Sequence, residues 1–137
     1  MAADRVERAL FLIRRWDAEL TRLCECCRRE AALEVETVSD GLQGLRLAKR
    51  MRPKLLLTEM ILPGLDGLSI CRALRREPAT SSIRLMMVSI LAAEERAREA
   101  GVDLFLRRPV EGERLVESAL RLLGRRFVGG PEMGISL

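Results

Sequence analysis

PKLLLTEMILPGLDG, residues 53–67, is the stretch of sequence that decides the fold. Residues 55–57 form a continuous leucine run without polar alternation, which is typical of a strand buried on both faces of a parallel sheet. The run ends in the polar residues Thr58 and Glu59, and a loop over residues 60–67 follows. We therefore expect a central strand whose carboxyl end presents Glu59 at one edge of a sheet, where parallel folds gather their functional groups.

The same alternation of a short apolar run with a segment of helical period recurs five times along the chain. It predicts an α/β fold of (βα)5 type, in which a doubly wound, five-stranded parallel sheet is covered by helices. The expected strands are residues 10–13, 35–38, 55–57, 85–88 and 104–106. The expected helices include residues 20–27, 41–50, 70–74, 92–100 and 113–123. Asp40 is expected to cap the second helix, and Gly101 to end the fourth in a left-handed conformation.

The length of 137 residues suits one compact domain. We expect a leader over residues 1–8, the domain over residues 9–123, and a flexible tail or linker stub over residues 124–137, which are rich in Gly and lack periodicity. No apolar stretch approaches the roughly 20 residues needed to cross a bilayer, and the start lacks the pattern of a signal peptide. We therefore expect a cytoplasmic protein without a membrane partner.

The charge balance is mildly basic, with 24 Lys and Arg against 20 Asp and Glu. Because the arginines recur on nearly every expected helix and alternate with acids, solvated helix faces explain most of them, and nucleic-acid binding is disfavoured. Arg121, Arg125 and Arg126 are interpreted as a solvated helix end. The chain has no His and no Tyr, so hydrolases that depend on these proton donors are also disfavoured.

Four segments resemble the receiver domain of response regulators in bacterial two-component signalling: VETVSDG, PKLLLTEMILPGLDG, LMMVSI and AGVDLFLRRPV. The resemblance covers about residues 9–123 and implies a flavodoxin-like receiver fold. It also implies a phosphoacceptor aspartate at the end of the third strand and an acid pair holding Mg²⁺ at the end of the first. A Ser or Thr ends the fourth strand in that family, and a Lys precedes a cis proline after the fifth.

This sequence keeps only part of that pattern. Ser89 retains the hydroxyl, Phe105 the switch aromatic, and Arg108 with Pro109 takes the place of the lysine and the cis proline. Glu59 stands where the resemblance places the phosphoacceptor aspartate.

The acid pair is lost as well. The alignment puts Arg15 and Trp16 at its positions, with Asp17 as the neighbouring acid, and a register one residue away is left open. Trp16 is expected to plug the vacant metal site, with anchoring of a partner as the alternative.

The substitutions change the charge of the expected pocket. Glu59 and Asp17 contribute two negative charges, and Arg15 and Arg108 contribute two positive ones, so the pocket is neutral without a metal. We therefore expect no Mg²⁺, no other metal or cofactor, no phosphorylation and no enzymatic activity. We also expect a bidentate ion pair between Glu59 and Arg108, either as a structural salt bridge or as a constitutive mimic of the phosphorylated state.

Two other features have structural interpretations. Asp66 lies in the loop between Gly64 and Gly67, so a turn or helix-cap role is expected. Cys24 and Cys27 are expected in the core and Cys26 as an exposed thiol, since a zinc site would need more ligands at a suitable spacing.

We interpret the chain as a degenerate receiver, or pseudo-receiver, that binds protein partners independently of phosphorylation. The resemblance implies a contact face made of the fourth helix, the fifth strand with Phe105, and the fifth helix, and a homodimer is one partner considered. Two alternatives remain open at this point: a working phosphoacceptor receiver with atypical residues, and a nucleic-acid-binding module.

Overall fold

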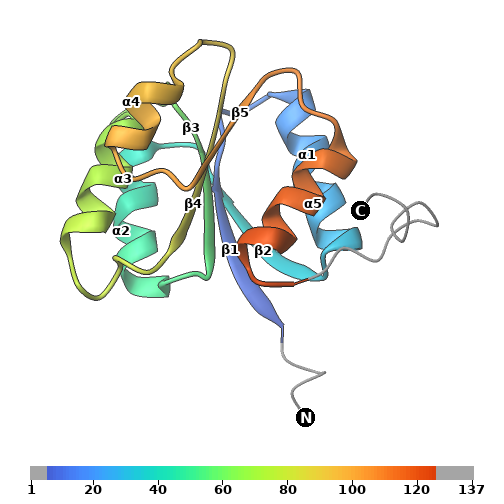
Figure 1. The fold of residues 1–137 in the computed structure, drawn as a ribbon, viewed down its shortest axis with the longest axis horizontal. Helices are drawn as coiled ribbons and strands as arrows, with labels where there is room; N and C mark the ends of the chain where they lie inside the picture. Colours follow the sequence, from blue (N-terminus) through green and yellow to red (C-terminus); the bar gives the residue numbers. More distant parts are fainter. Residues whose placement is uncertain (1–5, 126–137) are drawn as a thin grey trace.

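The computed structural model describes residues 6–125, which form a five-stranded parallel sheet with helices on both faces (Figure 1). The strand order is β2-β1-β3-β4-β5. The elements follow one another as β1 (Glu7–Leu12), α1 (Ala18–Glu30), β2 (Leu33–Val38), α2 (Gly41–Met51), β3 (Leu55–Glu59), α3 (Gly67–Arg76), β4 (Arg84–Ser89), α4 (Glu94–Glu99), β5 (Leu104–Arg107) and α5 (Gly112–Leu122). The (βα)5 prediction is therefore confirmed.

The sheet separates two apolar cores, because successive side chains of a strand point to opposite faces. Phe11 and Leu57 pack with α1 and α5 on one face. Leu10 and Leu56 pack with α2, α3 and α4 on the other. Figure 1 shows these two helical layers on either side of the sheet, which is viewed nearly edge-on. All five residues of β3 are buried, as its unbroken leucine run indicated.

Several boundaries differ from those expected from the sequence. β1 begins at Glu7, so the last two residues of the expected leader belong to the sheet, and β2 begins at Leu33. β1 starts with the charged residues Glu7 and Arg8, and exposed glutamates alternate with buried apolar residues in β2, so an apolar run alone does not reveal these strand starts. α4 spans only Glu94–Glu99, because Ala93 has a non-helical backbone and provides no side-chain cap. Residues 126–137 of the expected tail lie outside the described residues.

Aspartates cap three of the helices. Asp17, Asp40 and Asp66 accept hydrogen bonds from the backbone N–H groups three residues later, at 3.0, 2.9 and 2.9 Å. The cap interpretations of Asp40 and Asp66 are thereby confirmed. Gly101 has a φ of 90°, the left-handed conformation expected after the fourth helix.

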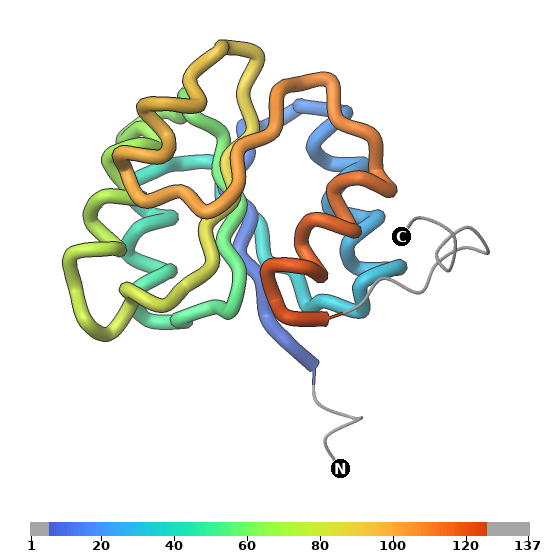
Figure 2. Tube along the Cα trace, in the orientation of Figure 1, coloured from blue at the N-terminus to red at the C-terminus, as the bar shows by residue number. Residues whose placement is uncertain are grey.

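The strand-end loops and the end of α5 lie at opposite ends of the sheet. The loops after β1, β3, β4 and β5 lie at the carboxyl ends of the strands, at the top of the view in Figure 2. The end of α5 lies at the opposite end, beside the start of β1, where Arg125 Nη1 is 3.1 Å from Glu7 Oε1. Among the described residues no helix is both long and apolar enough to traverse a bilayer.

Candidate functional site

Glu59 lies at the centre of the carboxyl-end loops, as the last residue of β3. Its side chain is only 6% exposed. β3 is flanked by β1 and β4, so residues that follow these two strands are the natural neighbours of this carboxylate.

Both oxygens of Glu59 have cationic or N–H partners. The backbone N–H of Arg14 donates a hydrogen bond to Oε2, and Nε of the same residue donates one to Oε1 at 3.2 Å. Nη1 of Arg108 lies 3.6 Å from Oε1. The expected contact between Glu59 and Arg108 is therefore present, but it is a single long ion pair, and the expected bidentate geometry is wrong.

The guanidinium of Arg108 binds two other carboxylates more closely. Its Nε donates to Glu19 Oε1 at 2.8 Å, and its Nη2 donates to Asp17 Oδ1 at 2.9 Å. The second oxygen of Glu19 accepts a hydrogen bond from the backbone N–H of Val110 at 2.8 Å. The start of α1 is thus tied to the loop that follows β5.

This network perturbs the acids at the start of α1. Burial raises the pKa of Asp17, but hydrogen bonds from Arg108 and from the backbone N–H of Leu20 outweigh burial and hold the pKa below its ordinary value. Burial also raises the pKa of Glu19, but hydrogen bonds from the backbone N–H of Val110 and from Arg108 outweigh burial, so the pKa of Glu19 is lowered. Both side chains are therefore ionised at neutral pH.

Ser89 ends β4 beside this network. Its Oγ accepts a hydrogen bond from the backbone N–H of Leu91 at 3.0 Å. Ser89 lines a hollow of about 110 Å³ together with Arg14, Glu59 and Arg108. The exposed residues Ile61 and Ile90 also line this hollow. Parallel strand ends thus bring Glu59, Ser89 and Arg108 together, as the sequence predicted.

Trp16 does not plug this site. Its side chain is 94% exposed, and its φ of 68° is unusual for a bulky residue. Trp16, with its left-handed backbone, directly precedes Asp17, the residue that caps the start of α1. The interpretation of Trp16 as a plug is therefore wrong.

The family model of the response regulator receiver domain matches residues 17–120. The chain belongs to this family. Receiver domains are signalling modules that interact with proteins such as kinases and effectors.

Relatives and solved structures agree with this assignment. The response regulator PleD of Caulobacter vibrioides is 30% identical in an alignment of 126 positions that covers 83% of this chain and 28% of PleD. The DNA-binding regulator RpaA of Synechocystis sp. is 30% identical in an alignment of 98 positions that covers 69% of this chain and 41% of RpaA. The chain therefore spans less than half the length of these relatives.

The fold is shared with the receiver domain of the sensor histidine kinase PA1611 from Pseudomonas aeruginosa PAO1. That crystal structure has a TM-score of 0.78 and 24% identity, and the match covers 88% of this chain and 99% of that one. PA1611 carries a magnesium ion coordinated in its active-site cleft.

In the present chain, the loop after β1 has the register one residue away from the aligned one, which is the alternative that the sequence left open. Arg14, one residue before the pair aligned from the sequence, contacts Glu59. Arg15 is exposed and its Nε donates to Ser39 Oγ at 3.3 Å. The loop between Leu12 and Asp17 has no apolar periodicity, so nothing in the sequence fixed which of its side chains turns inward.

Sequence reasoning also missed Glu19. The sequence predicted two acids and two arginines at this site. The structure has three carboxylates there, from Asp17, Glu19 and Glu59, and they surround the guanidinium groups of Arg14 and Arg108. A signal was available, because Glu19 follows the capping aspartate by two residues, in the first turn of a helix whose start faces the site.

The remaining predicted residues lie as follows. The Arg108-Pro109 peptide bond is cis, as expected. Phe105 is half-buried against the core beneath α2, α3 and α4. Cys24 and Cys27 are buried in the core, whereas Cys26 is partly exposed.

Within residues 6–125, no group of three or more His, Cys, Asp or Glu side chains is arranged to hold a metal ion.

Proposed function

We propose that this chain is a degenerate receiver that signals by binding protein partners and does not accept a phosphoryl group. The observation that carries the proposal is the occupation of the Glu59 carboxylate by Arg14 on one side and Arg108 on the other. Phosphoryl transfer depends on positioning and on stabilisation of the charge on the phosphoryl oxygens. A carboxylate already held by two guanidinium groups is poorly placed for attack.

The donor set does not fit Mg²⁺ either. That ion requires near-octahedral oxygen ligands at about 2.0–2.1 Å. The side chain from the β1 loop that reaches Glu59 is an arginine, which supplies positive charge in place of a ligand oxygen. Asp17 and Glu19 are engaged by Arg108 and by backbone N–H groups. Metal binding would have to displace these contacts.

Within this proposal, Glu59 serves to hold the β1–α1 loop. Its hydrogen bonds go to Arg14, and the Ser89 hydroxyl instead binds the backbone of its own loop. These contacts favour a structural salt bridge over a mimic of the phosphorylated state, which would be expected to engage the hydroxyl.

The face formed by α4, β5 and α5 is the proposed partner surface. It contains a hollow of about 320 Å³, whose lining includes Phe105, Glu94 and Arg114. A half-buried aromatic next to charged side chains of both signs is suited to contact with a protein, including a second copy of this chain.

The proposal is tested by incubating the protein with Mg²⁺ and acetyl phosphate, a small acyl phosphate, and measuring its intact mass. We expect no phosphoryl adduct on the wild-type chain, nor on Ser89→Ala as a matched site variant. A stable adduct on Glu59 or Asp66 would overturn the proposal and establish a working phosphoacceptor.

The metal site is tested separately by calorimetric titration with MgCl₂. We expect no binding to the wild type or to Glu59→Asp, because Arg14 still faces the shortened carboxylate. The double variant Arg14→Asp, Glu59→Asp removes that cation and is expected to gain affinity. Binding to Glu59→Asp alone would show that the β1-loop arginine matters less than proposed.

A further inference from the structure

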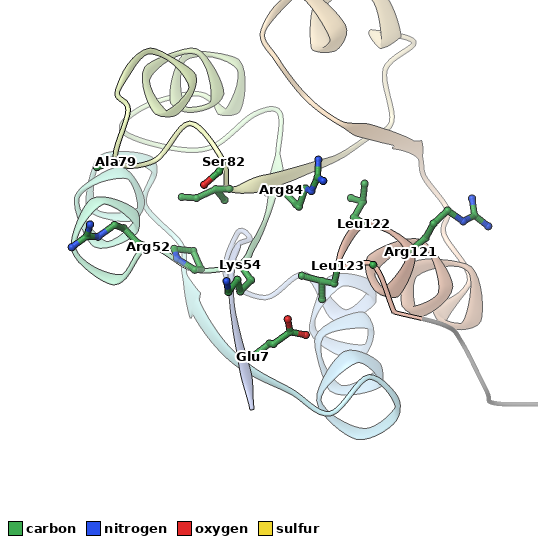
Figure 3. Close-up of a pocket in the computed structure, with 12 residues that line it drawn as sticks. Glu7, Arg52, Lys54, Ala79, Ser82, Arg84, Arg121, Leu122 and Leu123 are labelled. Carbon is green, nitrogen blue, oxygen red and sulfur yellow. The ribbon is translucent and has the colours of Figure 1, made fainter. Parts of the chain in front are cut away.

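A cavity lies at the end of the sheet opposite Glu59. Its volume is about 470 Å³, within the range of roughly 300–1,000 Å³ typical of small-molecule sites. It lies where β3 and β4 begin and α5 ends (Figure 3).

Four cations line this cavity: Arg52, Lys54, Arg84 and Arg121. Figure 3 shows Arg52 and Arg121 on opposite sides of it, with Lys54 between them. Arg121 has Glu117 as a partner at 3.4 Å, but no ion pair within residues 6–125 engages the other three. Glu7 also lines the cavity, and its carboxylate is engaged by Arg125 at 3.1 Å.

Helix ends explain only part of this charge. Arg52 caps the carboxyl end of α2 and Arg121 lies in the last turn of α5, where cations complement the helix dipole. Lys54 and Arg84 have no such role, because they stand at the starts of two neighbouring strands. The backbone N–H of Arg84 donates to the carbonyl of Lys54 at 3.1 Å, so the backbones of these two cationic residues are adjacent at this edge of the sheet, and both side chains line the cavity.

The cavity also has an apolar wall. Pro53 and Ile83 are buried in its lining, and Leu122 and Leu123 are half-buried. In the view of Figure 3, the side chain of Leu123 lies between Lys54 and Arg121. Such a wall can contact a flat apolar ring while the cations bind anionic groups attached to it.

We propose that this cavity binds a nucleoside di- or triphosphate, with the phosphates at Lys54 and Arg84 and the base against Leu122 and Leu123. At least two phosphates are required, because several uncompensated cations surround one volume. The charge-assisted contacts supply most of the affinity, and the apolar wall distinguishes a nucleotide from inorganic phosphates. The inference is independent of the proposed function, since none of these residues contacts the Glu59 network.

The test is calorimetric titration of the full chain with ATP, pyrophosphate and adenosine, with EDTA present so that the phosphates remain free of metal. We expect ATP to bind more tightly than pyrophosphate, and adenosine to bind more weakly than ATP. The double variant Lys54→Glu, Arg84→Glu should weaken ATP binding by about tenfold or more, because it removes two charge-assisted contacts.

Arg22→Glu, Arg96→Glu is the matched control. It makes the same change in net charge at two exposed arginines on α1 and α4. The control should bind ATP like the wild type, and circular dichroism should show both variants folded. Equal weakening in the two double variants, absence of ATP binding at millimolar concentration, or equal affinity for ATP and pyrophosphate would each overturn the proposal.

Discussion

Arg108 joins the start of α1 to the loop after β5 through the carboxylates of Asp17 and Glu19. Its side chain is 14% exposed, so these contacts are shielded from water and salt. Hydrogen bonds to the two acids outweigh the effect of burial, and the pKa of the guanidinium is raised. The residue is therefore a fixed cation around which three acids are arranged.

Replacing Arg108 with Met should destabilise the fold by about 3–5 kcal/mol, because it leaves partly buried carboxylates without their cation. Arg108→Lys keeps the charge but loses the planar fork that reaches both acids, and should cost about 1.5–3 kcal/mol. Urea unfolding at neutral pH measures both values. Arg22→Met, at an exposed position on α1, is the control; a loss from Arg108→Met no larger than that of the control would contradict the assigned role.

The same contacts predict a pH dependence. The ordinary pKa values are 3.8 for Asp17 and 4.5 for Glu19, and both are lowered in the folded chain. Their contribution to stability is therefore complete above the ordinary values and is lost as the pH falls through the lowered ones. The stability difference between wild type and Arg108→Met should shrink as the pH falls below about 4.5. A difference that stays constant down to acid pH would show that these acids do not carry it.

Trp16 combines a left-handed backbone with an almost fully exposed side chain. The conformation costs of order 1–3 kcal/mol for a bulky residue, and the indole recovers little of this through burial. Trp16→Asn, which tolerates the left-handed region, should therefore leave the free energy of unfolding unchanged or raise it by up to about 1 kcal/mol. Thermal unfolding at neutral pH measures the change. A clear loss of stability would mean that the indole makes contacts that its exposure does not suggest.

What the sequence could predict about the site follows from these residues. Glu59, Ser89 and Arg108 end strands or directly follow them, and parallel strands bring such positions together regardless of detail. The inward turn of Arg14 and the outward turn of Trp16 depend on backbone angles of a short loop. The spacing of apolar residues does not determine backbone angles in such a loop. Only the structure therefore shows which side chains of the loop after β1 face Glu59.

At the scale of the elements, β3 and α3 are joined by a close backbone contact. A Cβ at Gly67 would lie 2.2 Å from the backbone oxygen of Glu59, so the helix start could not remain in place. At Gly112, also the first residue of a helix, an added Cβ would meet the Sγ of Cys26 at 2.7 Å. A thiol can rotate away, whereas a strand carbonyl cannot.

Gly67→Ala should therefore destabilise the fold by about 1–3 kcal/mol, and Gly112→Ala by less than about 1 kcal/mol. Urea unfolding of the two variants provides the comparison, since both add one methyl at the start of a helix. Equal effects at the two positions would indicate that the α3 start can shift without cost and that the position of Glu59 does not depend on it.

The strands and most helices could be predicted because their apolar residues must face a core. β3 is the clearest case, since every one of its residues is buried. α4 was predicted too long, because alanines at its start suit a helix by propensity although their backbone is not helical. Tertiary structure decides such ends, and composition does not.

At the scale of the whole molecule, the two ends of the sheet differ in charge arrangement. At the carboxyl end, Asp17, Glu19 and Glu59 each face a guanidinium group. At the other end, Lys54 and Arg84 line one cavity and have no ion pair among the residues described. The net charge of +4 could not reveal this difference, because it depends on which residues the fold brings together.

The two cores share one sheet, and this predicts that they open together. Cys27 lies in the core under α1 and α5, and Cys71 lies in the other; burial raises the pKa of each thiol to about 12. In native protein treated with a thiol reagent and analysed by peptide mass spectrometry, the partly exposed Cys26 should react first. Cys27 and Cys71 should then react slowly and at equal rates, because β1, β3 and β4 contribute side chains to both cores and one layer cannot leave without the other. Faster labelling of Cys27 than of Cys71 would show instead that α1 and α5 separate from the sheet as an independent unit.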